Sequence, residues 1–244
     1  MDSIKVRLAD MCIEIRYRYP HTEKICRDYI TDDDEPAILS VMATDEDIAE
    51  EERESIRLHG QAFTPGYLES VCIYRNLCRK LPVYDVFFLH AAVISDGDGA
   101  YAFSAPSGTG KSTHILQWQK AFGDVITVVN GDKPLIRHVG GEWRAYGTPW
   151  CGKEGLNTNT SERLRGICFI ERGTENVIER LDLSAAADRV MRQVIIPPEP
   201  DAAIAMLGMV DGMIKEIPVW LLRCNISTEA AKVARDAMRG AELL

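Results

Sequence analysis

The stretch "SAPSGTGKSTH", residues 104–114, has the residue types and spacing of a loop that holds phosphate groups. From residue 105 to 112 it follows the Walker pattern G-x-x-x-x-G-K-[ST], except that alanine replaces the first glycine. Alanine is tolerated there when its φ is negative. The glycines let backbone N–H groups turn toward phosphate oxygens, the lysine reaches the outer phosphates, and the serine hydroxyl suits Mg²⁺. The predicted nucleotide contacts are Ala105, Pro106, Ser107, Gly108, Thr109, Gly110, Lys111, Ser112 and Thr113.

Two further side chains flank this loop at equal separations along the chain, His90 before Lys111 and Asp132 after it. Asp132 follows the apolar run "VITVVN", so we expect it at the end of a buried strand. A carboxylate beside the γ-phosphate can bind Mg²⁺ or accept a proton. His90 ends the run "DVFFLH". Taken alone, it is more simply explained as a histidine satisfied inside a core strand.

Alternating strand and helix patterns surround the loop. "YDVFFLHAAVIS" predicts one long strand, "DGDG" a hairpin turn and "AYAFSA" a second strand, with a helix from about 111 to 120. The pattern therefore places the loop between a strand and a helix, as a phosphate loop requires. Further strands are expected at "VITVVN", "GICFIER", "NVIERL" and "PVWLLRC", a hairpin over 134–147, and helices over 184–193, 201–214 and 227–239.

The amino-terminal part differs in character. "IKVRL" and "CIEIRYRY" alternate apolar and polar residues, which predicts half-buried strands. Thr64 and Pro65 begin a predicted helix that runs to about residue 82, and the acidic stretch 45–60 fits either a solvated helix or a loop. We therefore predict an α/β protein with a smaller β-rich accessory region, 1–81, and a core, 82–244, that carries the phosphate loop.

Composition narrows the class of partner. A formal net charge of -9 disfavours nucleic acids and anionic membranes, although it does not exclude ATP at a locally positive loop. The seven cysteines include no C-x-x-C, and several lie in apolar runs, which indicates reduced thiols. The amino terminus lacks the apolar core of a signal peptide, and no apolar run approaches a membrane span. We expect a cytoplasmic protein; a homo-oligomer is left open.

The segments "LHAAVISDGDGAYAFSAPSGTGKSTH" and "VVNGDKPLIR" resemble the HPr kinase/phosphorylase family and its HPr-kinase-like relatives, whose fold is related to phosphoenolpyruvate carboxykinase. The resemblance covers residues 84–137 and continues loosely to the carboxyl terminus. It implies ATP and Mg²⁺ as cofactors and a catalytic set of His90, Lys111 and Asp132. Asp132 would accept the proton of the acceptor hydroxyl, and Ser112 and Asp132 would bind the metal. Where the family has two adjacent aspartates, this chain has Gly131 before Asp132.

The resulting hypothesis is an ATP-dependent kinase that transfers the γ-phosphoryl group to a hydroxyl. The favoured acceptor is a serine in a protein or peptide, with a small molecule as the other option. One alternative is a carboxykinase-like enzyme acting on a small carboxylic acid, which would need clustered arginines and further metal ligands. The other is a non-catalytic nucleotide-binding regulatory module, which Gly131 keeps open. The loop "GTPWCGKEGLN", 147–157, fits equally a flap over the substrate and a surface connection.

Overall fold

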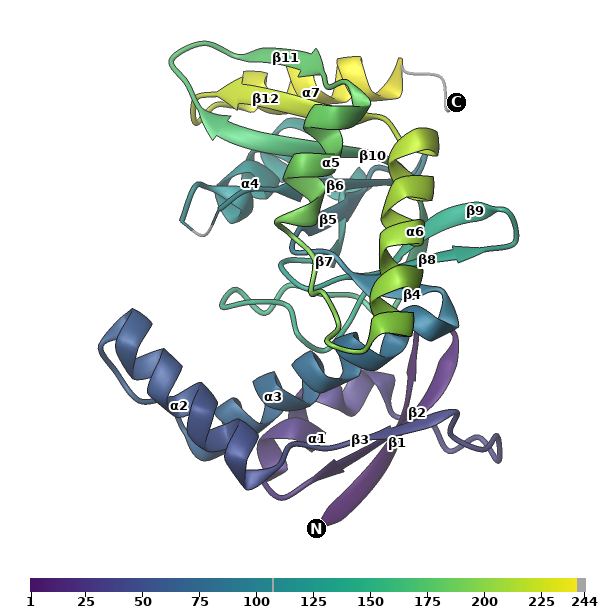
Figure 1. Ribbon diagram of the computed structural model, residues 1–244. Coiled ribbons are helices and arrows are strands. Elements are labelled where there is room, and N and C mark those ends of the chain that lie inside the picture. The colour runs from purple at the N-terminus through teal and green to yellow at the C-terminus, as the bar shows by residue number, and fades with distance from the viewer. Residues whose placement is uncertain (107, 241–244) are drawn as a thin grey trace. The chain divides into compact units, whose positions relative to one another are not determined.

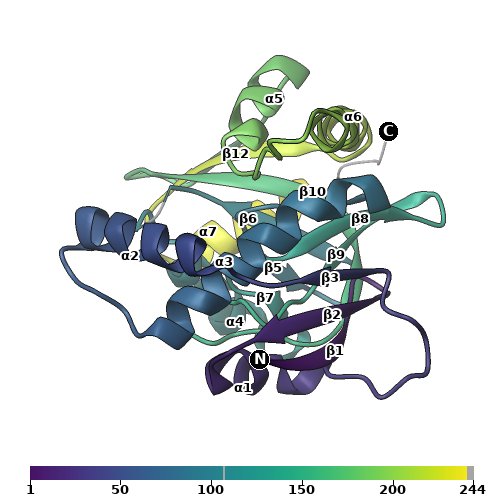
Figure 2. The ribbon, with the colours of Figure 1, turned by 60° about the horizontal axis from the view of Figure 1, so that its bottom comes forward.

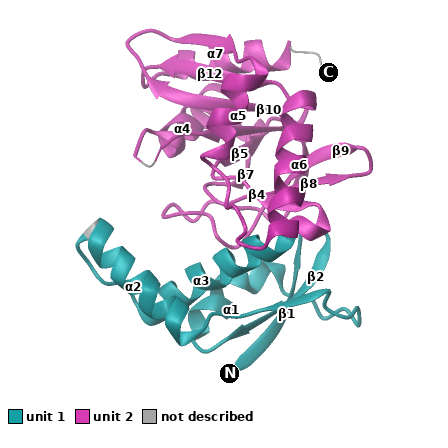
Figure 3. Cartoon of the chain, in the orientation of Figure 1, with its two compact units in different colours: residues 1–81 teal, residues 82–244 magenta. Residues whose placement is uncertain are grey.

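The computed structural model describes residues 1–106 and 108–240, apart from the side chain of residue 59. The chain forms two compact units, Met1–Leu81 and Pro82–Leu244 (Figure 3). Each unit combines a sheet with helices, so the predicted mixed α/β class is correct. No helix in the described part of the chain is long and apolar enough to cross a membrane.

The first unit holds a three-stranded sheet in which β2 pairs antiparallel with β1 and parallel with β3. A tight turn at Ala9 and Asp10, both with positive φ, joins the first two strands. The elements of this unit are β1 (Asp2–Leu8), β2 (Met11–Tyr17), α1 (Pro20–Cys26), η1 (Arg27–Tyr29), β3 (Leu39–Val41), α2 (Asp45–His59) and α3 (Pro65–Lys80).

More residues of the first unit lie in helices than in strands, so the prediction that residues 1–81 are β-rich is wrong. The reason lies in α2, where the acidic stretch forms a capped helix. The Thr44 side chain accepts a hydrogen bond from the Asp47 N–H, and the Asp47 carboxylate accepts one from the Thr44 N–H. Gly60 ends this helix in the left-handed conformation, with φ of 69°. Thr64 caps α3 in turn.

The second unit is built on a nine-stranded sheet. Its order is β4-β8-β9-β10-β6-β5-β7, with β12 beside β10 and β11 beside β12. The strands are β4 (Val86–Phe88), β5 (Ala92–Ser95), β6 (Ala100–Ser104), β7 (Thr127–Asn130), β8 (Leu135–Val139), β9 (Glu142–Tyr146), β10 (Ser161–Arg172), β11 (Val177–Arg180) and β12 (Val219–Cys224). The helices are η2 (Leu81–Tyr84, at the boundary between the units), α4 (Lys111–Phe122), η3 (Gly123–Val125), α5 (Leu183–Met191), α6 (Pro200–Glu216) and α7 (Thr228–Arg239).

Helices cover both faces of this sheet. Strand β6 shows why, because its side chains alternate between two hydrophobic clusters. Ala100 and Ala102 belong to the cluster that contains side chains of α5 and α6. Tyr101 and Phe103 belong to the cluster that contains side chains of α4 and α7. Figures 1 and 2 show the two helix pairs on opposite sides of the sheet. The strand before the phosphate loop is thus held from both sides.

The predicted long strand over residues 84–95 is wrong, because the structure breaks it between β4 and β5. Strand β4 pairs with β8, whereas β5 pairs with β6 and β7, so the backbone changes partners between them. In the break, the N–H of His90 donates to the Gln193 carbonyl at 2.7 Å. His90 therefore lies in the gap between two strands and not on a strand.

Candidate functional site

Sheet topology brings the predicted residues to one edge. Strand β5 runs antiparallel to both of its neighbours, so its first residues lie beside the last residues of β6 and β7. His90 precedes β5, the phosphate loop follows β6 and Asp132 follows β7. Three segments that are separated in sequence therefore meet at one end of three adjacent strands. The Ser104 hydroxyl at the end of β6 secures this junction by donating to the His90 carbonyl at 2.8 Å.

The two glycines of the predicted phosphate loop lie between β6 and α4 in conformations that favour glycine. Gly108 and Gly110 have φ of 76° and 128°, which a side chain would strain. Ala105 does not have a positive φ. Among the described residues, the only non-glycine residues that do are Ala9, Asp10 and Asp85. Alanine at the first position therefore leaves the turn unstrained, and its methyl group is buried. Ser107 lies outside the described residues.

His90 lies between Lys111 and Asp132, with its Nε2 within hydrogen-bond distance of both. The Lys111 Nζ lies 3.1 Å from Nε2 of His90, and that nitrogen lies 3.2 Å from Oδ1 of Asp132. The lysine also donates to the Ala105 carbonyl at 3.2 Å, so its ammonium is folded back onto the start of the loop. Nδ1 of His90 lies 3.1 Å from the Gln193 Oε1. Because one imidazole nitrogen cannot both accept from Lys111 and donate to Asp132, these two contacts compete.

Charge at this edge centres on the Asp132 carboxylate. Burial alone would raise the pKa of Asp132, but the hydrogen bond from His90 and the charge of Lys133 outweigh it and hold that pKa well below its usual range. The Lys133 ammonium forms an ion pair with Oδ2 of the same carboxylate. Burial lowers the pKa of Lys111, and the negative charge of Asp132 partly offsets this. Asp132 is therefore ionised throughout the physiological range.

The loop 147–157 is fastened to the segment that carries Asp132. Asn130 is fully buried, and its Nδ2 donates to the carbonyls of Thr148 and Trp150 at 3.1 and 3.3 Å. Its Oδ1 accepts from the Asp132 N–H at 2.9 Å. The Gly131 N–H donates to the Leu156 carbonyl at 2.8 Å. One buried amide thus orients both the loop and the backbone of Asp132.

Gly131 stands where the resembled family has its first aspartate, and the packing explains the glycine. A Cβ at this position would lie 2.8 Å from the Cys151 carbonyl oxygen and 3.2 Å from that of Leu156. Both contacts are to backbone atoms of the loop 147–157, which cannot move without disturbing the bonds to Asn130. The loop occupies the space that a second carboxylate would need.

The donor atoms at this edge suit a nucleotide-borne magnesium ion. Ser112 supplies a hydroxyl and Asp132 a carboxylate, which are oxygen ligands of the kind that Mg²⁺ prefers. Within residues 1–106 and 108–240, no group of three or more His, Cys, Asp or Glu side chains could hold a metal. This fits Mg²⁺ in phosphoryl-transfer sites, where one or two protein ligands combine with phosphate oxygens and waters. The clustered additional ligands of the carboxykinase-like alternative are absent from this part of the chain.

Three contacts at this edge come from residues that sequence reasoning did not single out. Lys133 adjoins Asp132 in the motif "NGDK" and could have been chosen as a neighbouring charge. Gln193 touches His90 through both its backbone and its side chain, but no sequence signal marks it. Arg172 ends β10 and donates to the carbonyls of Gly108 and Thr109. The sequence alone could not reveal this contact, because it depends on the register between β10 and β6.

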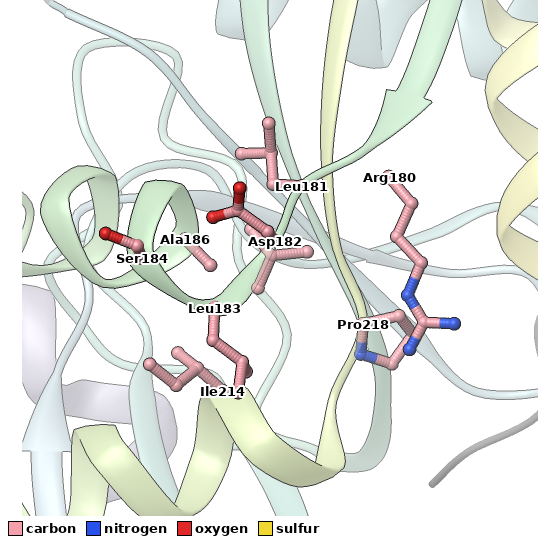
Figure 4. A pocket seen from close by; sticks show the side chains of 9 residues that line it. Arg180, Leu181, Asp182, Leu183, Ser184, Ala186, Ile214 and Pro218 are labelled. Atoms are coloured by element: carbon pink, nitrogen blue, oxygen red, sulfur yellow. The ribbon is translucent and has the colours of Figure 1, made fainter.

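A cavity of about 570 Å³ lies elsewhere in the second unit, between the start of α5 and the end of α6 (Figure 4). Its lining is mostly apolar and includes Leu183, Ile214 and Pro218, with Arg180 at its margin. None of the predicted site residues lines it. The residues predicted to carry chemistry therefore lie at the sheet edge and not in this cavity.

Comparison with known proteins gives little further information. No protein-family model and no curated protein matches the chain. Among solved structures, the HPr(Ser) kinase/phosphatase from Coxiella burnetii aligns with 63% of this chain and 99% of its own, at 8% sequence identity and a TM-score of 0.36.

Proposed function

We propose that this protein is an ATP-dependent phosphotransferase of the HPr-kinase-like type, which moves the γ-phosphoryl group of ATP to a hydroxyl. The observation that carries the proposal is the meeting of His90, Lys111 and Asp132 beside a glycine-rich loop at the start of α4. Phosphoryl transfer uses a cation at the phosphates and a group that orients the acceptor, and Lys111 and the ionised Asp132 could supply these, with His90 in contact with both.

In the proposed mechanism, the loop from Ala105 to Thr113 surrounds the triphosphate. Its N–H groups and the amino end of α4 bind the phosphate oxygens. Lys111 leaves the Ala105 carbonyl and neutralises the charge that gathers on the leaving β-phosphate. Ser112 and Asp132 would hold Mg²⁺, which would neutralise phosphate charge when bound.

Asp132 would also orient the acceptor. The acceptor oxygen forms a bond to the γ-phosphorus as the bond from that phosphorus to the β–γ bridging oxygen breaks, and ADP leaves. The acceptor proton passes to the Asp132 carboxylate. A carboxylate with so low a pKa is a weak base, so the transfer occurs late, when bond formation has already acidified the hydroxyl. Positioning therefore contributes more than basicity. The favoured acceptor is a serine hydroxyl in a protein or peptide, with a small hydroxy compound as the other option.

The deciding experiment is incubation with Mg²⁺ and γ-labelled ATP in the presence of candidate proteins, peptides and hydroxy metabolites. We expect label on an acceptor hydroxyl, and its loss in Lys111→Met. Lys120→Met, at the opposite end of α4, is the matched control and should transfer normally. Label found only in inorganic phosphate would indicate a hydrolase. Tight Mg·ATP binding without any turnover would indicate the regulatory module, and no binding would refute the proposal.

A further inference from the structure

Arg172 is the last residue of β10, and its guanidinium lies against the phosphate loop. It donates to the Gly108 carbonyl at 2.7 Å from one terminal nitrogen and to the Thr109 carbonyl at 3.3 Å from Nε. The sheet register explains the contact. Strand β10 runs parallel to β6 with Phe169 opposite Ser104, so the end of β10 lies beside the segment that follows β6.

Both hydrogen bonds act on peptide units of the loop, one of which precedes the Gly110 N–H and the other the Thr109 N–H. In a planar trans peptide, the carbonyl and the following N–H point in opposite directions. Fixing the Thr109 carbonyl toward Arg172 therefore turns the Gly110 N–H away from Arg172. Fixing the Gly108 carbonyl does the same for the Thr109 N–H, which closes a turn onto the Pro106 carbonyl at 3.2 Å. A charged donor on a carbonyl also polarises its peptide, so the N–H becomes a stronger donor.

Arg172 does little else in the described part of the chain. Its side chain is exposed, and both of its hydrogen bonds end on the loop. The adjacent Glu171 forms ion pairs with Arg189 and Arg223 instead. The two hydrogen bonds therefore stabilise one conformation of the loop. The two glycines that give the loop its positive φ angles leave it entropically costly to order without such a restraint.

We infer that Arg172 is a positioning residue that holds the phosphate loop in its nucleotide-binding shape from the outer side. The inference rests on the proposed function, because it assigns Arg172 to the same nucleotide site. Both of the hydrogen bonds that Arg172 makes in the described part of the chain end on backbone carbonyls of the loop, and neither involves His90, Lys111 or Asp132. Removal of Arg172 should therefore weaken nucleotide binding and leave the transfer step nearly intact.

The test compares Arg172→Ala and Arg172→Lys with the parent and with Arg223→Ala, an exposed arginine on β12 that does not touch the loop. Mg·ATP affinity is measured by calorimetry, and KM and kcat by label transfer. We expect Arg172→Ala to raise both Kd and KM for ATP about tenfold, because the loop must be ordered at binding, with kcat within about twofold of the parent. The Kd and KM of Arg172→Lys should lie between those of the parent and those of Arg172→Ala. A lysine ammonium is a single point charge and cannot bond two carbonyls at once as the planar guanidinium does.

Several outcomes would overturn the inference. One is parent-like Kd in Arg172→Ala, and another is an equal loss in Arg223→Ala. A fall in kcat without a change in KM would place Arg172 in the chemical step instead. If Arg172→Ala does not fold, the graded loss in Arg172→Lys decides the question alone. Failure of the proposed function is separately visible, because the parent itself would then not bind Mg·ATP.

Discussion

Replacing Gly131 tests why this chain lacks the first of the two aspartates in the family it resembles. Gly131 does not have a positive φ, so alanine meets no backbone strain. The obstacle is steric, because the new Cβ would lie 2.8 Å and 3.2 Å from two carbonyl oxygens of the loop 147–157. We expect Gly131→Ala to destabilise the protein and Gly131→Asp to destabilise it more, since a carboxylate would then face those carbonyls and Asp132.

The expected size follows from the packing. Forcing an extra carbon against a well-packed backbone costs about 1–3 kcal/mol. For a unit of this size, each kcal/mol lowers the melting temperature by about 2–4 °C, so Gly131→Ala should melt about 2–12 °C below the parent. The measurement is thermal unfolding followed by calorimetry or circular dichroism. Phosphoryl transfer should fall in parallel, because the same shift moves the Asp132 backbone through Asn130.

Gly208→Ala is the matched control. Gly208 is exposed on α6, and a Cβ there would meet no atom within 4 Å. Alanine in a helix is favoured over glycine, so this variant should melt at or slightly above the parent temperature. Two results would refute the reasoning. One is an unchanged melting temperature in Gly131→Ala, and the other is faster transfer in Gly131→Asp, which would mean that a second carboxylate fits.

Three further predictions concern single side chains. Lys111→Met preserves the volume of the buried stem but removes the charge, so Mg·ATP binding measured by calorimetry should be lost without a change in melting temperature; parent-like binding would mean that the loop is not the nucleotide site. Asp132→Asn should slow label transfer about 10²-fold or more while ATP still binds, and an unchanged rate would shift the base to His90. Burial lowers the pKa of His114 to about 4, below the 6.5 of an exposed imidazole, so its contribution to stability is complete above pH 6.5 and is lost as the pH falls toward 4. The free energy of unfolding should drop by about 3 kcal/mol over that range, and His114→Gln, which retains an acceptor for Trp118, should flatten the profile.

Local patterns in the sequence predict most of the elements around the site. The helices α6 and α7 and the strand β12 between them follow from apolar periodicity and from capping residues such as Ser227. The order of β6, a glycine-containing loop and α4 follows from the same local patterns. These features depend on neighbours within a few residues, which is why one sequence suffices to find them.

Contacts between distant segments were not predictable in the same way. The segment 84–95 is apolar on both sides of His90, which predicts one strand, yet β4 and β5 pair with different strands and leave His90 between them. At that break the His90 N–H donates to the Gln193 carbonyl, which lies far along the chain. The same holds for Arg172, whose place depends on the register of β10 against β6. Hydrophobic periodicity carries no information about which strands become neighbours.

The resting contacts of Asp132 connect nucleotide binding to the base that would act on the acceptor. Both carboxylate oxygens are engaged, one by His90 and the other by Lys133, while Lys111 is folded back onto the Ala105 carbonyl. A triphosphate brings negative charge to this edge and competes with Asp132 for the same cations. As Lys111 turns toward phosphate oxygens, the His90 nitrogen that it shares with Asp132 becomes free to donate to the carboxylate, and that hydrogen bond is the largest influence that holds the pKa of Asp132 low. In the proposed mechanism Asp132 therefore stays a weak base when the phosphoryl donor is in place, and its contribution is to position the acceptor.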